Sequence, residues 1–109
     1  MRRAARTDAP HKAIVSALRK VGCQVLDLSR VGRGCPDLLV RVPGQLQEQN
    51  LPVIFRGAIG FLGPQYLLLE VKTGRHILNP RQRKFKSEWP EVRIVHSIIE
   101  ALQAVGIQP

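Results

Sequence analysis

The chain has 109 residues, of which 44% are hydrophobic, and it carries 17 Lys and Arg against 8 Asp and Glu. A chain of this length buries one small core, so we expect a single domain over residues 1–109, and the hydrophobic content excludes a disordered tail. The formal charge of +9 and the pI near 10.8 favour a polyanionic partner, although the same charge fits a basic face that only keeps the protein soluble.

The first predicted element is a helix from about residue 9 to residue 21. Asp8 fits its N-cap and Pro10 fits its first turn, while Gly22 is expected to end it. His11 falls on the apolar stripe of this helix, at helical spacing from its Ile, Val and Leu residues. We therefore expect His11 to face the interior.

Three strands follow, predicted over residues 23–29 (CQVLDLS), 37–42 (DLLVRV) and 66–72 (YLLLEVK). A turn-rich loop of sequence VGRGCP separates the first two strands. Residues 43–65 form a long connection before the third strand, rich in Pro, Gly and isolated apolar residues. Because such a length is unusual in a compact domain, this connection is either a functional insert or contains an extra hairpin around the sequence VIF.

The last third of the chain alternates helix and strand. A helix is predicted over residues 79–89 (NPRQRKFKSEW), with Asn79 as its cap and Pro80 at the first helical position. A fourth strand follows over residues 92–96 (VRIVH), and a final helix ends before Gly106. The whole order predicts an α/β fold in which helices flank one small mixed sheet.

The two cysteines, Cys23 and Cys35, are too few for a structural zinc site and are not spaced like a redox pair. They are expected to fill space in a reducing compartment. The basic start of the chain, MRRAAR, is not followed by an apolar stretch of signal-peptide or membrane-spanning length. We therefore expect a cytoplasmic protein that does not contact a membrane.

Charged residues interrupt two of the predicted strands. Glu70 and Lys72 lie two residues apart on the third strand, so their side chains leave the same face of the sheet. Asp37 begins the preceding strand, where strand pairing can bring it beside Glu70. Two carboxylates that close repel unless a cation lies between them, and such oxygen ligands suit Mg²⁺ or Mn²⁺. The simpler alternative is an exposed salt bridge between Glu70 and Lys72, with Asp37 as a turn residue.

Two segments, GCPDLL and LLLEVK, resemble the signature of the PD-(D/E)xK nucleases through Asp37, Glu70 and Lys72. The surrounding sequence resembles the VRR-NUC family of that superfamily, which contains small nucleases that occur alone or as modules of larger repair enzymes. The resemblance extends over the loop before Asp37, the helix start LNPRQ and the end VRIVHSIIEAL. It leaves out residues 43–65, which would be an insert atypical of the family.

This resemblance implies a restriction-endonuclease-like fold and a divalent-metal-dependent DNA endonuclease. It implies that Asp37 and Glu70 bind Mg²⁺ or Mn²⁺ and that the Val71 carbonyl completes the site. Lys72 would assist the attacking water, and Gln82 would support the site from its helix. Branched or structured DNA, such as a Holliday junction, would be the substrate of a homodimer that cuts two strands symmetrically. Apolar residues of the insert are expected to form part of the dimer interface.

Gln82 has a second basis for a role at the site. It shares a helical stripe with Phe85 and Trp89, which are expected to pack on the sheet, so a polar side chain on that stripe needs an interior partner. The alternative is that Gln82 only closes a capping box with Asn79. The two roles are expected to exclude each other, because they compete for one side chain.

Several cationic residues near the predicted site are expected to contact DNA phosphates. They are Arg33, Arg75, Arg81, Arg83, Lys84 and Lys86. The alternative for each of them is a place on a solvated surface.

The first helix departs from the family pattern, because nucleases of this kind often carry an acidic residue there and this helix contains no Glu. His11 stands on its inward stripe instead. His11 is either a half-buried histidine bonded to backbone or a neutral group that faces the metal site. The number of metal ions therefore stays open. Two other functions also stay open. One is a nucleic-acid-binding module of the same fold with little activity, and the other is an interaction protein whose insert docks on a partner.

Overall fold

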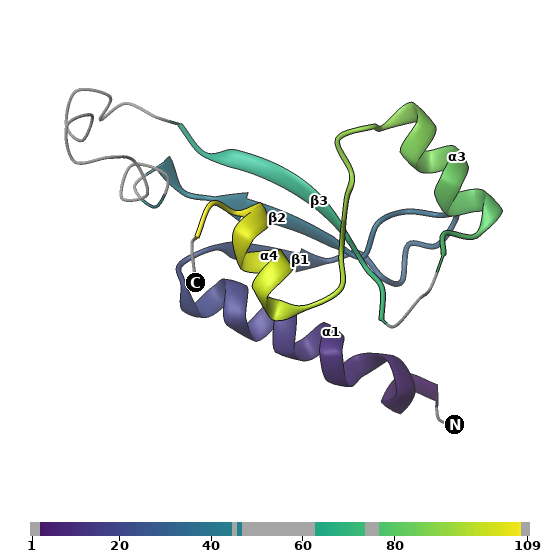
Figure 1. The fold of residues 1–109 in the computed structure, drawn as a ribbon, viewed down its shortest axis with the longest axis horizontal. Helices are drawn as coiled ribbons and strands as arrows, with labels where there is room; N and C mark the ends of the chain where they lie inside the picture. The colour runs from purple at the N-terminus through teal and green to yellow at the C-terminus, as the bar shows by residue number, and fades with distance from the viewer. Residues whose placement is uncertain (1–2, 45, 47–62, 74–76, 108–109) are drawn as a thin grey trace.

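A computed structural model describes residues 3–44, 46, 63–73 and 77–107 of the chain. The sheet contains four strands in this part of the chain, which lie side by side in sequence order (Figure 1). They are β1 (Gln24–Asp27), β2 (Leu38–Val42), β3 (Gln65–Val71) and β4 (Arg93–Val95). The first three pair antiparallel, whereas β4 runs parallel to β3. The prediction of a small mixed sheet is therefore confirmed for the described residues.

The same residues form three helices, α1 (Arg3–Lys20), α3 (Pro80–Glu88) and α4 (Ile98–Ala104). α1 and α4 lie against each other and contact the outer strands β1 and β4 (Figure 1). α3 lies beyond the carboxyl end of β3, apart from the other two helices. The α/β class is thus confirmed, and α3 is set at one end of the sheet.

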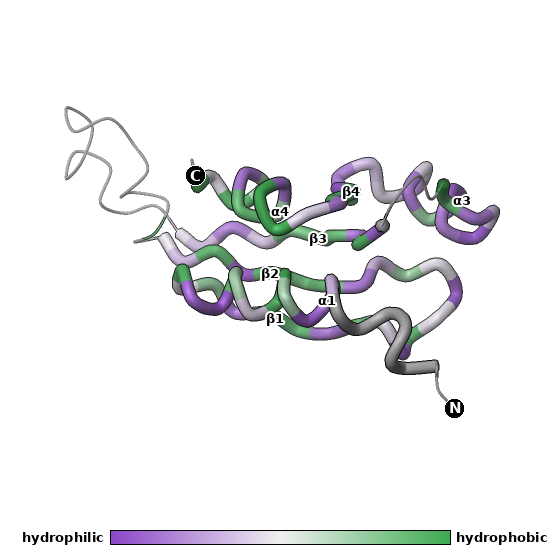
Figure 2. Tube along the Cα trace, turned by 60° about the horizontal axis from the view of Figure 1, so that its bottom comes forward, coloured by the Kyte–Doolittle hydropathy of each residue, from purple (hydrophilic) through white to green (hydrophobic). Residues whose placement is uncertain are grey.

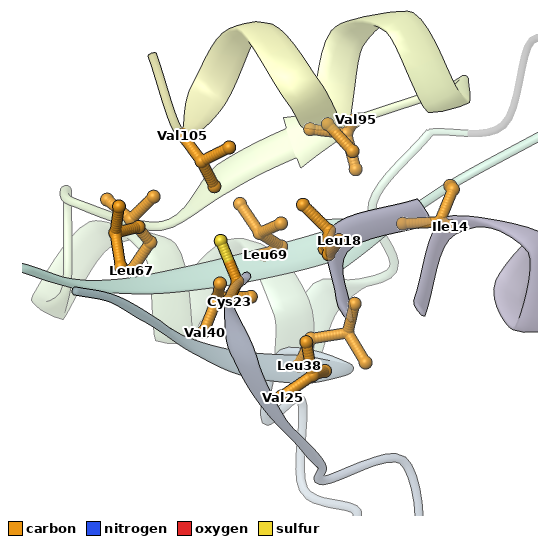
Figure 3. Packing of buried hydrophobic residues seen from close by; sticks show 12 residues of the cluster. Ile14, Leu18, Cys23, Val25, Leu38, Val40, Leu67, Leu69, Val95 and Val105 are labelled. Carbon is orange, nitrogen blue, oxygen red and sulfur yellow. The ribbon is translucent and has the colours of Figure 1, made fainter. Parts of the chain in front are cut away.

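The hydrophobic core lies between the sheet and the pair α1 and α4 (Figure 3). Its members alternate along the strands, as side chains on one face of a sheet must. They are Ile14, Leu18, Cys23, Val25, Leu38, Val40, Val42, Leu67, Leu69, Val95, Ala101 and Val105. Figure 2 shows hydrophobic residues along β2 and β3 but a mostly hydrophilic α3. Each fully buried Val or Leu contributes roughly 1.5–3 kcal/mol, so this layer supplies the main driving force for folding.

The start of α1 differs from the prediction. The helix begins at Arg3, so Asp8 is not its N-cap and Pro10 lies in its interior. The reason is that the residues before Pro10 include Ala and Arg, which have high helix propensity and extend the helix past Asp8 and Pro10. The predicted end is confirmed, because the helix stops at Lys20 and Gly22 takes a φ of 105°.

The first strand is shorter than predicted. β1 ends at Asp27, where the Ser29 backbone N–H donates to Asp27 Oδ1 at 2.8 Å. An Asp side chain that accepts from the residue two places on forms a local turn, which takes the chain out of the sheet.

Residues 45 and 47–62 of the predicted insert lie outside the described part of the chain. The hairpin expected around VIF and the apolar residues expected at a dimer interface fall within this segment. Among the described helices, none combines the length and the apolar character needed to cross a membrane.

Candidate active site

The pairing of β2 with β3 brings Asp37 and Glu70 together. Leu38 pairs with Leu69 in antiparallel register, so Asp37 just before β2 lies opposite Glu70. The Asp37 carboxylate is fixed by the neighbouring strand, since the Val71 backbone N–H donates to Asp37 Oδ2 at 2.8 Å. The predicted meeting of the two carboxyl groups is therefore present.

Glu70 is buried on one face of the sheet, with only 4% of its surface exposed. Burial is the main cause that raises its pKa to about 8, followed by the negative charge of Asp37 and the hydrogen bond between the two carboxyl groups, while Lys72 opposes the shift. Near neutral pH the pair therefore keeps a proton that an exposed pair would release. A cation placed between the two groups would replace that proton.

Two further side chains contact the same oxygen of Glu70. Gln82 Nε2 donates to Glu70 Oε2 at 3.1 Å, and Lys72 Nζ lies 3.8 Å from that oxygen. Both partners are half-buried. The simpler alternative of an exposed salt bridge between Glu70 and Lys72 is wrong, because Glu70 is enclosed on the sheet face below the start of α3.

Gln82 also closes the capping box of α3. Its Oε1 accepts from the Asn79 backbone N–H at 3.0 Å, and its own backbone N–H donates to Asn79 Oδ1 at 2.9 Å. The expectation that capping and site support exclude each other is wrong. An amide side chain carries an acceptor and a donor on different atoms, so Oε1 caps the helix while Nε2 contacts Glu70.

The loop before β2 holds the start of α3 in place through Gly34. This glycine has a φ of 80°, and a Cβ atom added there would lie 2.5 Å from the Arg81 carbonyl carbon and 2.9 Å from the Gln82 nitrogen. Only glycine allows the loop backbone to come this close to the helix backbone. The loop that carries Asp37 and the helix that carries Gln82 are thus packed directly on each other.

Val71 offers a third oxygen ligand beside the carboxyl pair. Its N–H points towards Asp37, and in a β-strand the carbonyl of a residue points to the same side as its N–H. Within the described residues, no group of three or more His, Cys, Asp or Glu side chains could hold a metal ion. Two carboxylates and a carbonyl still fit Mg²⁺, which binds through one or two carboxylates and completes its shell with water and substrate phosphates.

Cys35 lies close to the same pair, although the sequence alone did not place it at the site. Burial is the largest cause that raises the pKa of its thiol, and the charges of Glu70 and Asp37 raise it further. A thiol that stays protonated is a poor nucleophile, so Cys35 fills space here. The sequence signal that could have placed Cys35 at the site is its position two residues before Asp37.

The cationic residues expected to contact DNA separate into two groups around α3. Arg33, Arg81 and Lys84 line one open hollow of ≈ 280 Å³, whereas Arg83 lines another of ≈ 330 Å³ together with Lys72. Arg75 lies outside the described residues.

Lys86 has a different partner from the expected one, since its Nζ donates to the Val92 carbonyl at 2.8 Å. This hydrogen bond fixes the segment between α3 and β4. The aromatic pair of Phe85 and Trp89 stacks with ring centroids 5.8 Å apart. Trp89 is 50% exposed and Phe85 is half-buried, so the pair is only partly covered.

His11 lies against β1. Its Nε2 is 3.2 Å from Asp27 Oδ2, so its partner is a carboxylate and not backbone. Asp27 follows buried Val25 by two residues and leaves β1 on the helix-facing side, whereas Glu70 follows buried Leu69 and leaves β3 on the opposite side. Strand alternation therefore separates His11 from the carboxyl pair.

Comparison of the chain with models of protein families, with curated proteins and with solved structures gives no match. The resemblance to the VRR-NUC family stays a prediction that rests on the motif residues.

Proposed function

We propose that this protein is a divalent-metal-dependent DNA endonuclease with a restriction-endonuclease-like fold. The observation that supports this function best is the contact of buried Glu70 with half-buried Asp37, with Lys72 Nζ 3.8 Å from Glu70 Oε2. A buried carboxyl group beside another acid costs stability, and such arrangements are typical of functional sites. The combination of two acids, a lysine and a carbonyl matches the needs of phosphodiester hydrolysis.

The side chains would divide the chemistry between them. Asp37, Glu70 and the Val71 carbonyl would hold Mg²⁺ or Mn²⁺, which when bound acts as a Lewis acid towards a phosphate oxygen. Lys72 is placed to orient the attacking water and to stabilise negative charge that develops on the phosphate. Gln82 keeps Glu70 Oε2 in one orientation, and such outer partners are worth about 10–100-fold in metal affinity or activity.

The basic surface around α3 supports DNA as the substrate. Arg33, Arg81 and Lys84 line one hollow close to the site, and the chain as a whole carries a formal charge of +9. Contacts of this kind bind the sugar-phosphate backbone without reading its sequence. Branched DNA as the preferred form and a homodimer as the active species are proposals that come from the resemblance to VRR-NUC nucleases.

The test is cleavage of supercoiled plasmid and of labelled linear, forked and four-way DNA in Mg²⁺, Mn²⁺ or EDTA. Wild type should cut in Mg²⁺ or Mn²⁺ only. Asp37→Asn and Glu70→Gln should each slow cutting by at least about a hundredfold while leaving DNA binding largely intact. Glu91→Gln, which removes an exposed carboxylate, is the matched control and should cut at the wild-type rate. Cutting by Asp37→Asn at the wild-type rate would rule out the assignment.

A second candidate is a nucleic-acid-binding module without activity. It is favoured by the position of His11, because that side chain contacts Asp27 and not the carboxyl pair. Salt-dependent DNA binding by wild type with no cutting in either metal would support this second candidate.

A further inference from the structure

The second hollow beside α3 adjoins the carboxyl pair and has the chemistry of a nucleotide-binding pocket. It has a volume of ≈ 330 Å³ and combines three groups that can donate hydrogen bonds with an apolar wall. The residues that line it are Lys72, Arg83, His96, Ile77, Leu78 and Ile94. Lys72 belongs to both places, since its Nζ lies 3.8 Å from Glu70.

His96 is held in one orientation by Glu100. Glu100 Oε1 lies 2.9 Å from His96 Nδ1 and accepts from the His96 backbone N–H at 2.8 Å. The hydrogen bond from the His96 side chain is the main cause that lowers the pKa of Glu100, so this carboxyl group is ionised and can only accept. His96 Nδ1 must therefore carry the hydrogen, and Nε2, which this contact leaves unused, can donate to a phosphate oxygen when the ring is in its imidazolium form.

Arg83, which lines the same hollow, is anchored by the backbone. One guanidinium nitrogen donates to the Leu78 carbonyl at 2.7 Å, which fixes the planar group. A guanidinium has five N–H donors in a rigid fork that matches phosphate, and this contact uses one of them. The Lys72 backbone N–H donates to the Val95 carbonyl at 3.0 Å, which sets Lys72 beside His96.

We propose that this hollow is a subsite for the nucleotide next to the cleaved bond, with Arg83 and His96 binding its phosphate. The apolar wall of Ile77, Leu78 and Ile94 contacts the sugar and base of the same nucleotide. The proposal rests on the proposed nuclease function, because it assigns a substrate contact to the same site. His96 is a substrate-binding residue in this scheme, and Glu100 is a positioning residue that acts through it.

The test uses a DNA duplex with a defined cut, in which single phosphates on either side of the cut are replaced by uncharged methylphosphonates. In wild type, one flanking replacement should lower kcat/KM by roughly ten- to a hundredfold, because a hydrogen bond to a charged group is lost. Arg83→Gln and His96→Gln should lose a similar factor on unmodified DNA. Each variant should lose a smaller additional factor than wild type at that one position, since one of the two partner groups is already missing.

Arg93→Gln is the matched control, because it removes an exposed positive charge from the neighbouring strand β4 and leaves the hollow unchanged. It should keep the full sensitivity to the methylphosphonate. Glu100→Gln should weaken the discrimination at that position without abolishing it. If Arg83→Gln and His96→Gln lose the same additional factor as wild type at every position, the phosphate lies elsewhere and the subsite is overturned.

A separate measurement distinguishes failure of the subsite from failure of the nuclease function. The chain contains three histidines, so their ring signals can be assigned by NMR with single substitutions. Titration with a short duplex in EDTA should shift the His96 signals and leave those of His11 unchanged, because His11 lies on the other face of the sheet. Shifted His96 signals in a protein that cuts no DNA would retain nucleotide binding in the hollow and reject the nuclease function. Unchanged His96 signals with bound DNA would reject the subsite even if the protein cuts.

Discussion

Helices α1 and α3 are held to the sheet by different forces. α1 buries Ile14 and Leu18 in the core, where they are 1% and 0% exposed. α3 has no buried residue, and polar contacts fix its first turn. Hydrophobic burial is large and non-directional, whereas a hydrogen bond contributes only about 1 kcal/mol but fixes a geometry. The comparison indicates that α1 stabilises the fold, while α3 positions Gln82 over Glu70.

The difference predicts that stability and activity can be changed separately. Substitutions of the core residues of α1 should greatly lower the free energy of unfolding. Substitutions in the first turn of α3 should disturb the site and lower that free energy less. The four predictions below test this division, starting with the largest expected effect.

Leu18→Ala should cost about 2–5 kcal/mol in the free energy of unfolding, because it opens a cavity in a fully buried position. Phe85→Ala on α3 is the comparison, and its cost should be below about 2 kcal/mol because that side chain is only half-buried. Urea unfolding followed by circular dichroism measures both. Equal losses for the two variants would contradict the division between the helices.

The carboxyl pair should make the metal-free protein less stable as pH rises. The unfolded chain releases the Glu70 proton near the ordinary glutamate pKa of 4.5, but the folded chain keeps it until about 8. Between these values the folded state binds more protons, so this contribution is fully present below 4.5 and is lost as pH rises through 8. The slope should approach at most about 1.4 kcal/mol per pH unit for one proton.

Unfolding in EDTA at a series of pH values measures this slope. Glu70→Gln cannot titrate and should remove this contribution, while Glu91→Gln, at an exposed position, should keep it. Saturating Mg²⁺ should flatten the slope in wild type, because the cation binds the deprotonated pair. If the free energy of unfolding of wild type and of Glu70→Gln depends on pH in the same way, Glu70 does not hold its proton in the folded state and the contact with Asp37 is not formed.

Two glycines of the loop before β2 allow a matched test of whether this loop positions α3. Gly32 and Gly34 have φ values of 77° and 80°, so alanine is strained at both, at a cost of roughly 1 kcal/mol. Only at Gly34 would the new Cβ meet the backbone of Arg81 and Gln82. Gly34→Ala should therefore destabilise the protein more than Gly32→Ala and slow cutting by about tenfold or more, by moving Gln82 away from Glu70.

Plasmid nicking and thermal unfolding of the two variants measure these effects. Gly32→Ala should cut at nearly the wild-type rate. A Gly34→Ala variant that cuts as well as Gly32→Ala would show that close packing of the loop on α3 is not needed to position the site.

Much of the fold was predictable because its signals are local. Their apolar runs placed β2 and β3 to within one residue, and Asn79 and Pro80 marked the start of α3 with the capping pattern that the structure contains. The start of α1 was not predictable from Asp8 and Pro10, because helix propensity before Pro10 outweighs the N-cap signal of Asp8.

The site was predictable only as far as strand spacing fixes it. The two-residue spacing of Glu70 and Lys72 and the register of β2 with β3 determine the carboxyl pair. The role of His96 depends on its contact with Glu100 and on the register of β4 along β3, and the sequence analysis fixed neither of these two details. The contact of His11 with Asp27 likewise depends on how α1 packs on β1.

The smallest expected effect concerns His11, and it tests whether the two faces of the sheet have separate roles. The pair with Asp27 joins a side chain that is 12% exposed to one that is 53% exposed, and partly exposed pairs of this kind contribute about 0–1 kcal/mol. Hydrogen bonding to Ser29 is the largest cause that lowers the pKa of Asp27, with His11 as a weaker one, so Asp27 remains ionised and locally bonded without the histidine. His11→Ala should therefore unfold at most about 1 kcal/mol more easily and should cut DNA at the wild-type rate. Urea unfolding, Mg²⁺ titration and plasmid nicking of His11→Ala and His11→Gln measure these quantities. Slower cutting or weaker Mg²⁺ binding by His11→Ala, with folding unchanged, would instead place His11 among the residues that serve the metal site and would show that α1 contributes to both faces.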